Sequence, residues 1–112
     1  MTVKLERKTK ETVISLELSP EGGEIRVSIS CGFLRHMVEL FAFHAGIGLV
    51  AEAGGDEEVD WHHLTEDLGI VLGRAFGMAA AEAPRKRYGW CALPMDGSLV
   101  LAAADLGGRG QF

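Results

Sequence analysis

The spacing of apolar residues changes near residue 33 of this chain, and that change constrains the fold more than any other feature. Apolar and polar residues alternate over residues 12–18 and again over residues 25–30, which is typical of strands with one buried face. Residues 19–23 interrupt the alternation, so the two runs predict an antiparallel hairpin. From residue 33 to residue 46 the apolar side chains recur at steps of three and four, which predicts a helix packed on that hairpin.

The middle of the chain repeats the change from strand to helix. Residues 47–53 form a short apolar run that ends at a Gly-Gly-Asp turn, which predicts a third strand. Asp60 is a candidate N-cap, because its carboxylate can accept hydrogen bonds from the free N–H groups of a first helical turn. Pro84 sets the last possible end of this second helix. Its predicted buried stripe consists of Leu64, Leu68, Leu72, Ala75 and Phe76.

The last segment predicts a further hairpin. Residues 88–93 and 98–104 are two mostly apolar runs, and residues 94–97 form the turn between them. The predicted fold is therefore α+β: a ββαβα unit over residues 1–84, with its helices on one face of a mixed sheet, and a β-hairpin over residues 85–112. The hairpin either closes the sheet of the first unit or begins a second copy of that unit.

Composition narrows the class of protein. The chain has 112 residues, of which 47% are hydrophobic, so it can bury a core, and its formal charge of −5 does not favour nucleic acid or an anionic membrane. Cys31 and Cys91 are too few and too far apart for a disulfide framework. The charged N-terminus does not resemble a secretory signal, and no apolar stretch is long enough to span a bilayer. We therefore expect a soluble protein of the reducing cytoplasm.

The start of the second predicted helix carries the most informative chemistry. Adjacent residues of a helix point about 100° apart, so His62 and His63 are poorly placed to share one ion, whereas Glu66 projects between them. Neutral imidazoles and a carboxylate suit manganese, iron or zinc, and two neighbouring metal sites fit this spacing better than one. The competing interpretation is that these side chains only decorate a helix terminus. His36 and His44 on the preceding helix are additional candidates.

Basic residues near the last hairpin are candidates for binding an anion. Arg85, Lys86 and Arg87, together with Arg109, can hold a phosphate, because guanidinium groups match phosphate oxygens with two parallel hydrogen bonds. The alternative is a solvated run of charge. No helix is predicted after the glycine-rich residues 107–110, so they are not a P-loop.

Seven short motifs, taken in order, resemble the sequence signature of the imidazoleglycerol-phosphate dehydratase family. They cover nearly the whole chain at close to the family's spacing. They are TKET at 9–12, GFLRHM at 32–37, GD at 55–56, VDWHHLTED at 59–67, RYG at 87–89, PMD at 94–96 and DLGGR at 105–109.

This resemblance implies a fold and an activity. Enzymes of the family consist of two ββαβα repeats and assemble into large symmetric oligomers, with manganese ions bound by residues of both repeats. They are lyases of histidine biosynthesis that eliminate water from imidazole glycerol phosphate to give imidazole acetol phosphate. Residues 1–84 would then be a first repeat, and residues 85–112 the beginning of a second.

The resemblance also assigns roles to individual residues. Glu11 matches a glutamate used in acid–base catalysis. The residues that match substrate-binding positions are Arg87, Arg109 and Asp96. The residues that match metal ligands of the first repeat are His36, His62, His63 and Glu66.

Some positions depart from the family pattern. Arg35 stands where the family has an aspartate, and Gly97 replaces a glutamate, while Gly108 and Gly110 stand in a changed SGRP. A second HHxxE is absent from these 112 residues, so the two-manganese site implied by the resemblance would be completed only by another chain or repeat. Two hypotheses remain. One is a manganese-dependent dehydratase that acts on a small phosphate substrate as a homo-oligomer. The alternative is a non-catalytic half-repeat that serves in folding or assembly.

Overall fold

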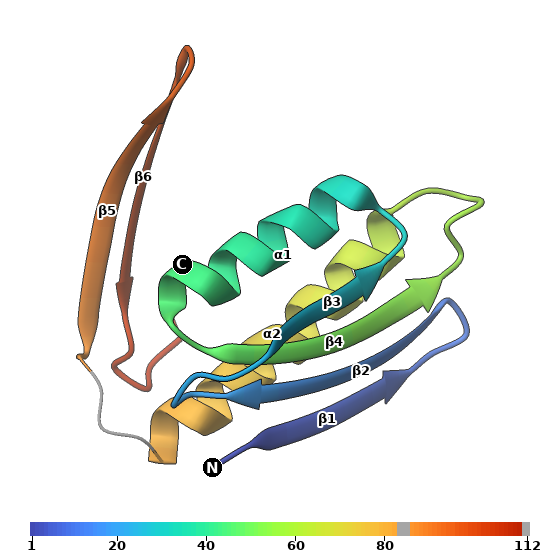
Figure 1. Cartoon of the computed structure of the whole chain (residues 1–112), viewed down its shortest axis with the longest axis horizontal. Coiled ribbons are helices and arrows are strands. Elements are labelled where there is room, and N and C mark those ends of the chain that lie inside the picture. Colours follow the sequence, from blue (N-terminus) through green and yellow to red (C-terminus); the bar gives the residue numbers. More distant parts are fainter. Residues whose placement is uncertain (83–85, 111–112) are drawn as a thin grey trace.

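A computed structural model of the chain describes residues 1–82 and 86–110, which form six strands and two helices (Figure 1). Pro84 and Arg85, which the sequence analysis singled out, lie outside the described residues. The elements are β1 (Val3–Lys8), β2 (Thr12–Ser19), β3 (Ile25–Ile29), α1 (Gly32–Ala45), β4 (Gly48–Gly55), α2 (His62–Glu82), β5 (Tyr88–Met95) and β6 (Ser98–Asp105).

The main sheet has the strand order β1-β2-β4-β3 (Figure 1). β4 pairs antiparallel with β2 and parallel with β3, so it separates the two strands that we predicted to form a hairpin. The predicted β2–β3 hairpin is therefore wrong. After β3 the chain crosses over through α1 and returns as β4, which allows the parallel pairing of β3 with β4. Leu49 and Ala51 of β4 are buried, as befits a central strand.

β1 is a strand that we did not predict from the sequence. It pairs antiparallel with β2, with Val3 opposite Leu18 and Lys8 opposite Val13. Its inward positions include Arg7, a charged residue, so the local pattern lacks the plain alternation of a half-buried strand. The side chain of Arg7 has a partner in α2, described below.

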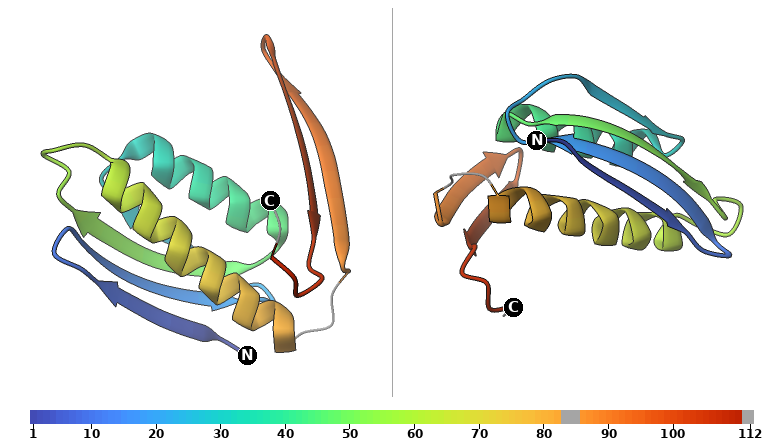
Figure 2. Two further views of the ribbon diagram at one scale, coloured as in Figure 1. Left: turned by 180° about the vertical axis from the view of Figure 1, so that it is seen from behind. Right: turned by 90° about the horizontal axis from the view of Figure 1, so that it is seen from below.

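Both helices cover one face of the main sheet (Figure 2). Ile14, Leu16 and Leu18 of β2 point into this layer, whereas Val13 and Ser15 lie on the open face. The predicted α+β class, with helices on one face of a mixed sheet, is confirmed. The core under the helices comprises Val3, Ile14, Leu16, Leu18, Val27, Ile29, Val38, Ala42, Ile47, Leu49, Ala51, Leu64, Leu68, Val71, Ala75 and Ala79.

The two helices begin and end close to their predicted bounds. Gly46 follows α1 with φ 69°, in the left-handed region that glycine adopts readily, and its N–H bonds to the last carbonyls of the helix. Phe33 and Phe41 belong to the apolar spacing that predicted α1, and they are 75% and 41% exposed. The stripe is thus only partly covered in this structure. Among the described residues, no helix is both long and apolar enough to cross a membrane.

β5 and β6 form the predicted second hairpin, with a turn at Asp96 and Gly97. They make a separate two-stranded sheet, so the hairpin does not close the main sheet. Every residue of both strands is exposed, including Trp90 at 76% and Leu101 at 72%. The hairpin projects away from the helices and the main sheet (Figures 1 and 2).

Candidate functional site

The topology gathers most of the predicted site residues at one end of the sheet, on the right in Figure 1. Thr12 lies opposite Gly55, which places the β1–β2 turn beside the end of β4. Because β3 runs parallel to β4, both helices begin at this same end. The end, hereafter the histidine end, therefore carries Glu11 from the turn, His36 from α1, and His62, His63 and Glu66 from α2.

The beginning of α2 is fixed by the predicted cap. A carboxylate oxygen of Asp60 accepts a hydrogen bond of 2.8 Å from the backbone N–H of His62. The carboxylate satisfies a donor that would otherwise lack a partner in the first helical turn. Asp60 thus holds the two histidines at the first positions of the helix, as the sequence predicted.

His63 is turned toward β4. Its Nδ1 lies 2.7 Å from Oδ2 of Asp56, which raises the pKa of the imidazole chiefly through this hydrogen bond. An ionised carboxylate only accepts, so Nδ1 carries the proton and Nε2 has the free lone pair when the ring is neutral. The other Asp56 oxygen, Oδ1, is buried and has no hydrogen-bond partner among the described residues.

His62 faces in a different direction. Its Nε2 lies 3.4 Å from Oε2 of Glu66, one helical turn later, and both side chains are more than half exposed. The rings of His62 and His63 meet edge-on, with centroids 5.5 Å apart. Glu66 therefore lies beside His62 rather than between the two histidines.

The donor types at this end fit a metal ion, but the described residues do not complete a metal site by themselves. Imidazole nitrogens and a carboxylate suit manganese or zinc. No group of three or more such side chains is close enough, in the described part of the chain, to hold an ion. His62 with Glu66 supplies two adjacent donors, and His63 supplies a separate one whose orientation is already fixed. Further ligands would have to come from outside these residues.

The β1–β2 turn holds Glu11 by its backbone. Oγ1 of Thr9 accepts from the N–H groups of Glu11 and Thr12, at 3.1 and 3.0 Å. The carbonyl of Glu11 accepts from the N–H of Asp56 at 2.9 Å, which ties the turn to the end of β4. A Cβ at Gly55 would lie 2.4 Å from that carbonyl oxygen, so only glycine allows this close approach. The side chain of Glu11 is exposed.

A buried polar contact beneath the histidine end was not predicted. Thr12 donates its hydroxyl to Oδ2 of Asp67 at 2.6 Å, and Nε of Arg7 donates to Oδ1 of Asp67 at 3.1 Å. The Thr12 bond, followed by the Arg7 bond, lowers the pKa of the Asp67 carboxyl against the opposing effect of burial. Both Thr12 and Asp67 stand in motifs that carried the family resemblance, so their signal was present without an assigned role.

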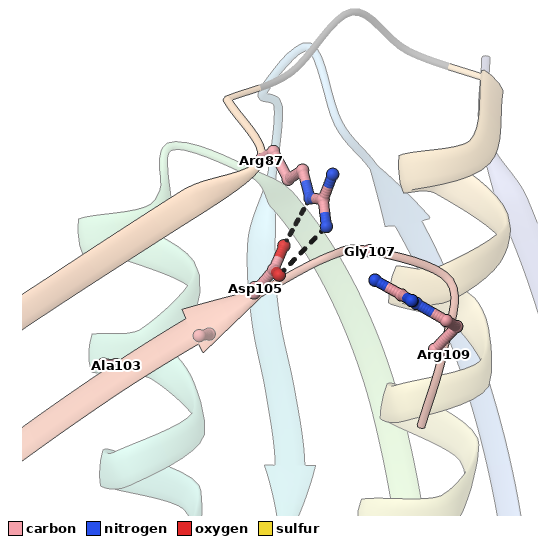
Figure 3. Close-up of a pocket in the computed structure, with 6 residues that line it drawn as sticks. Arg87, Ala103, Asp105, Gly107 and Arg109 are labelled. Atoms are coloured by element: carbon pink, nitrogen blue, oxygen red, sulfur yellow. Dashed lines mark hydrogen bonds and ion pairs between the residues drawn. The ribbon is translucent and has the colours of Figure 1, made fainter. Parts of the chain in front are cut away.

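Arg87 and Arg109 border a hollow of about 560 Å³ beside the base of the hairpin (Figure 3). Arg87 donates to the Asp105 carboxylate with Nε at 2.6 Å and Nη2 at 3.2 Å, which raises the pKa of Arg87 and lowers that of Asp105. A Cβ at Gly107 would lie 2.7 Å from Nη2 of Arg87, so the glycine leaves room for this guanidinium. The hollow is thus bordered by two guanidinium groups, and that of Arg87 is already paired with Asp105.

The structure separates the arginines from the histidine end. They lie beside the carboxyl end of α2, which at 21 residues is about 31 Å long at 1.5 Å per residue. Asp96 lies at the tip of the hairpin, at the far end of an eight-residue strand from Arg87, or about 26 Å at 3.3 Å per residue. The structure therefore groups Glu11 and the metal-ligand candidates, but places Arg87 with Arg109 elsewhere and Asp96 apart from both.

A one-sided mixed sheet, with imidazoles and carboxylates gathered where its two helices begin, defines an α+β protein with a candidate metal-binding end. The family model described as imidazoleglycerol-phosphate dehydratase matches residues 30–112. The chain belongs to the imidazoleglycerol-phosphate dehydratase family.

Individual relatives agree with this assignment. The chain is 49% identical over 105 residues to imidazoleglycerol-phosphate dehydratase from Thermodesulfovibrio yellowstonii, a match that covers 92% of this chain and 55% of the relative. It is also 49% identical over 112 residues to that of Rhodopirellula baltica, covering 98% of this chain and 55% of the relative. The chain thus spans about half the length of the curated relatives it matches.

Solved structures show the same relationship. The dehydratase of Staphylococcus aureus matches with a TM-score of 0.81 and 34% identity, over 97% of this chain and 59% of that one. The dehydratase of Pyrococcus furiosus matches with a TM-score of 0.76 and 36% identity, over 94% of this chain and 56% of that one.

Proposed function

We propose that this chain supplies one part of a manganese-dependent imidazoleglycerol-phosphate dehydratase site, which a second copy or a second repeat completes. The observation that carries the proposal is the convergence of the family motifs at the histidine end. Three of the motifs, TKET, GD and the HH segment, are joined there by the Glu11–Asp56 and Asp56–His63 hydrogen bonds. Family membership supports the reaction, the elimination of water from imidazole glycerol phosphate.

Four side chains are proposed as metal ligands. His62 and Glu66 form one donor pair, and His63 and His36 contribute donors to a second position at the same end. These four side chains would hold manganese, which would supply Lewis-acid stabilisation of the negative charge that develops on the substrate. The carboxylate of Glu11, exposed on the adjacent turn, is proposed to move the proton.

Arg87 and Arg109 are proposed to hold the phosphate, with Asp96 as a further substrate contact. Arg109 is exposed and borders the same hollow as Arg87, so both present charge to an anion there. Because α2 separates this hollow from the histidine end, we propose that the arginines of one copy serve the histidines of another. This arrangement makes a homo-oligomer part of the function.

Exposed apolar surface supports the proposed association. The hairpin exposes Trp90, Leu99 and Leu101, and α1 exposes Phe33 and Phe43. An isolated two-stranded hairpin is at best marginally stable in water, so it needs a covering surface.

Cys31 and Cys91 are free thiols, which suits the proposed location in the reducing cytoplasm.

A manganese titration tests the proposal. The purified chain is titrated with Mn²⁺ while its mass is followed by light scattering and the conversion of imidazole glycerol phosphate is assayed. The proposal expects Mn²⁺ binding, an increase in mass and turnover. A His62→Ala, Glu66→Ala double variant should lose the turnover and one of the two classes of Mn²⁺ site. Glu58→Gln, an exposed carboxylate change in the loop before α2, is the control. Metal-linked assembly without turnover would select the non-catalytic half-repeat instead.

A further inference from the structure

Asp56 is bonded to two separate parts of the histidine end. Its Oδ2 lies 2.7 Å from Nδ1 of His63, and its backbone N–H donates to the carbonyl of Glu11 at 2.9 Å. We infer that Asp56 is a positioning residue, which fixes His63 in the tautomer that leaves Nε2 free for a metal ion. This inference rests on the proposed function, because that proposal makes His63 a ligand.

The chemistry of the two groups determines the tautomer. A neutral imidazole has one protonated nitrogen and one nitrogen with a free lone pair, and a metal binds the latter. Since an ionised carboxylate accepts but does not donate, the 2.7 Å contact requires the proton on Nδ1. The lone pair then lies on Nε2, at the far side of the ring. Hydrogen bonds of this kind commonly orient metal-bound histidines and raise their basicity.

The surroundings keep the Asp56 carboxylate in place. Its side chain is only 22% exposed, against 43% for His63, so the carboxylate is more shielded from solvent than the ring to which it bonds. Its second oxygen is buried and has no hydrogen-bond partner among the described residues. Within that part of the chain, the hydrogen bond of the carboxylate is therefore the one to His63. The backbone of Asp56 is anchored by Glu11, and Gly55 permits the close approach.

This geometry connects the proposed catalytic turn to a proposed ligand. A shift of the β4 end would displace the carbonyl contact to Glu11 and the side-chain contact to His63 together. We therefore assign Gly55–Asp56 to the alignment of the site. The alternative is a purely structural ion pair, which would hold the loop whichever imidazole nitrogen carries the proton. The tautomer of His63 distinguishes the two roles.

The experiment compares the parent chain with Asp56→Ala, Asp56→Asn and the control Glu58→Gln. ¹⁵N chemical shifts of the His63 ring are measured in the metal-free chain, above the pKa of the ring. The parent and Glu58→Gln should show protonated Nδ1 and unprotonated Nε2, and Asp56→Ala should move population to the opposite tautomer. Asp56→Asn preserves the shape of the side chain. If Asp56→Ala is disordered, the amide spectrum of Asp56→Asn shows whether a chain without the carboxylate retains the fold.

Manganese affinity is then measured from the electron paramagnetic resonance signal of free Mn²⁺. Loss of the Asp56 carboxylate should weaken binding about 10- to 100-fold, the usual effect of removing such a partner. An unchanged His63 tautomer in both Asp56 variants, or an equal loss of affinity in Glu58→Gln, would overturn the assignment. If the parent binds no Mn²⁺, the proposed function fails, whereas the tautomer result still decides the role of Asp56.

Discussion

The hydroxyl of Thr12 lies 2.6 Å from a carboxylate oxygen of Asp67, and this buried bond joins β2 to α2 across 55 positions of the sequence. Removing the hydroxyl leaves the carboxylate oxygen without that donor in a region closed to water. Thr12→Val keeps the shape of the side chain, so we expect the free energy of unfolding to fall by about 1–3 kcal/mol, the cost of an unsatisfied buried polar group. Urea denaturation measures the change. Thr65→Val, at an exposed position of α2, is the control, and an equal effect there would contradict the prediction.

The same carboxylate predicts a dependence of stability on pH. Hydrogen bonds from Thr12 and Arg7 lower the pKa of Asp67 in the folded chain, whereas the pKa of an unfolded aspartate is about 3.9. Between the two pKa values the unfolded state binds more protons, so stability rises with pH. The contribution of Asp67 is present above the unfolded pKa and is lost as the pH falls through the folded pKa.

Asp67→Asn provides the comparison for this pH dependence. The variant lacks the titrating group, so its free energy of unfolding should depend less on pH in the acidic range than that of the parent. Urea denaturation at a series of pH values measures both slopes. Parallel curves for the parent and the variant would contradict the predicted role of Asp67.

The fold could be predicted from sequence wherever a single segment carried its own pattern. β2, β3, β4, both helices and the last hairpin each had a clear period, apolar run or turn. The pairing of β3 with β4 had no such signal, because it depends on a crossover through α1 and brings distant segments together. β1 was missed because Arg7 occupies an inward position, and its partner, Asp67, lies 60 residues away.

The candidate site shows the same division. Imidazole and carboxylate side chains at short spacing predicted a role for His62, His63 and Glu66, and the motif resemblance added Glu11. The partners that orient them are contributed by other elements, so Asp56 and Asp67 remained without a role until the sheet register placed them. The orientation of the side chains could not be predicted either. The helical spacing placed Glu66 between the two histidines, whereas the observed rotamers pair it with His62.

The different directions of His62 and His63 predict two classes of metal-binding variant. His62 and Glu66 face each other at 3.4 Å, so they should serve the same ion. His62→Ala and Glu66→Ala should each weaken one class of Mn²⁺ site, and the double variant should lose little more than either single change, because residues that act together are not additive. His63→Ala should affect the other class. Titration calorimetry with Mn²⁺ distinguishes the classes, and full additivity of His62→Ala with Glu66→Ala would contradict the shared site.

The hollow beside the hairpin predicts anion binding that needs both arginines. Arg109→Ala removes a cation while the Arg87–Asp105 pair is preserved, so inorganic phosphate should bind about tenfold more weakly, the effect of losing one charge-assisted hydrogen bond of roughly 1.5 kcal/mol. Stability should change by less than about 0.5 kcal/mol, as for most surface substitutions. Phosphate titration followed by NMR measures the affinity. Arg74→Ala, an exposed cation of α2, is the matched control and should leave binding unchanged.

The exposed hairpin predicts association that depends on concentration. Trp90 and Leu101 lie on neighbouring strands, on the same face of the hairpin, because Trp90 pairs with Ala103 and Ala92 with Leu101. Covering such large apolar side chains is favourable by about 25 cal/mol for each Å² removed from water. The parent should therefore form oligomers in sedimentation velocity, and Trp90→Ser with Leu101→Ser should shift it toward the monomer while the main sheet remains folded. Val13→Ser, an exposed apolar change on the open face of the sheet, should leave the mass unchanged. A parent that is monomeric at all accessible concentrations would contradict the proposed assembly, because the apolar side chains of the hairpin would then stay exposed to water.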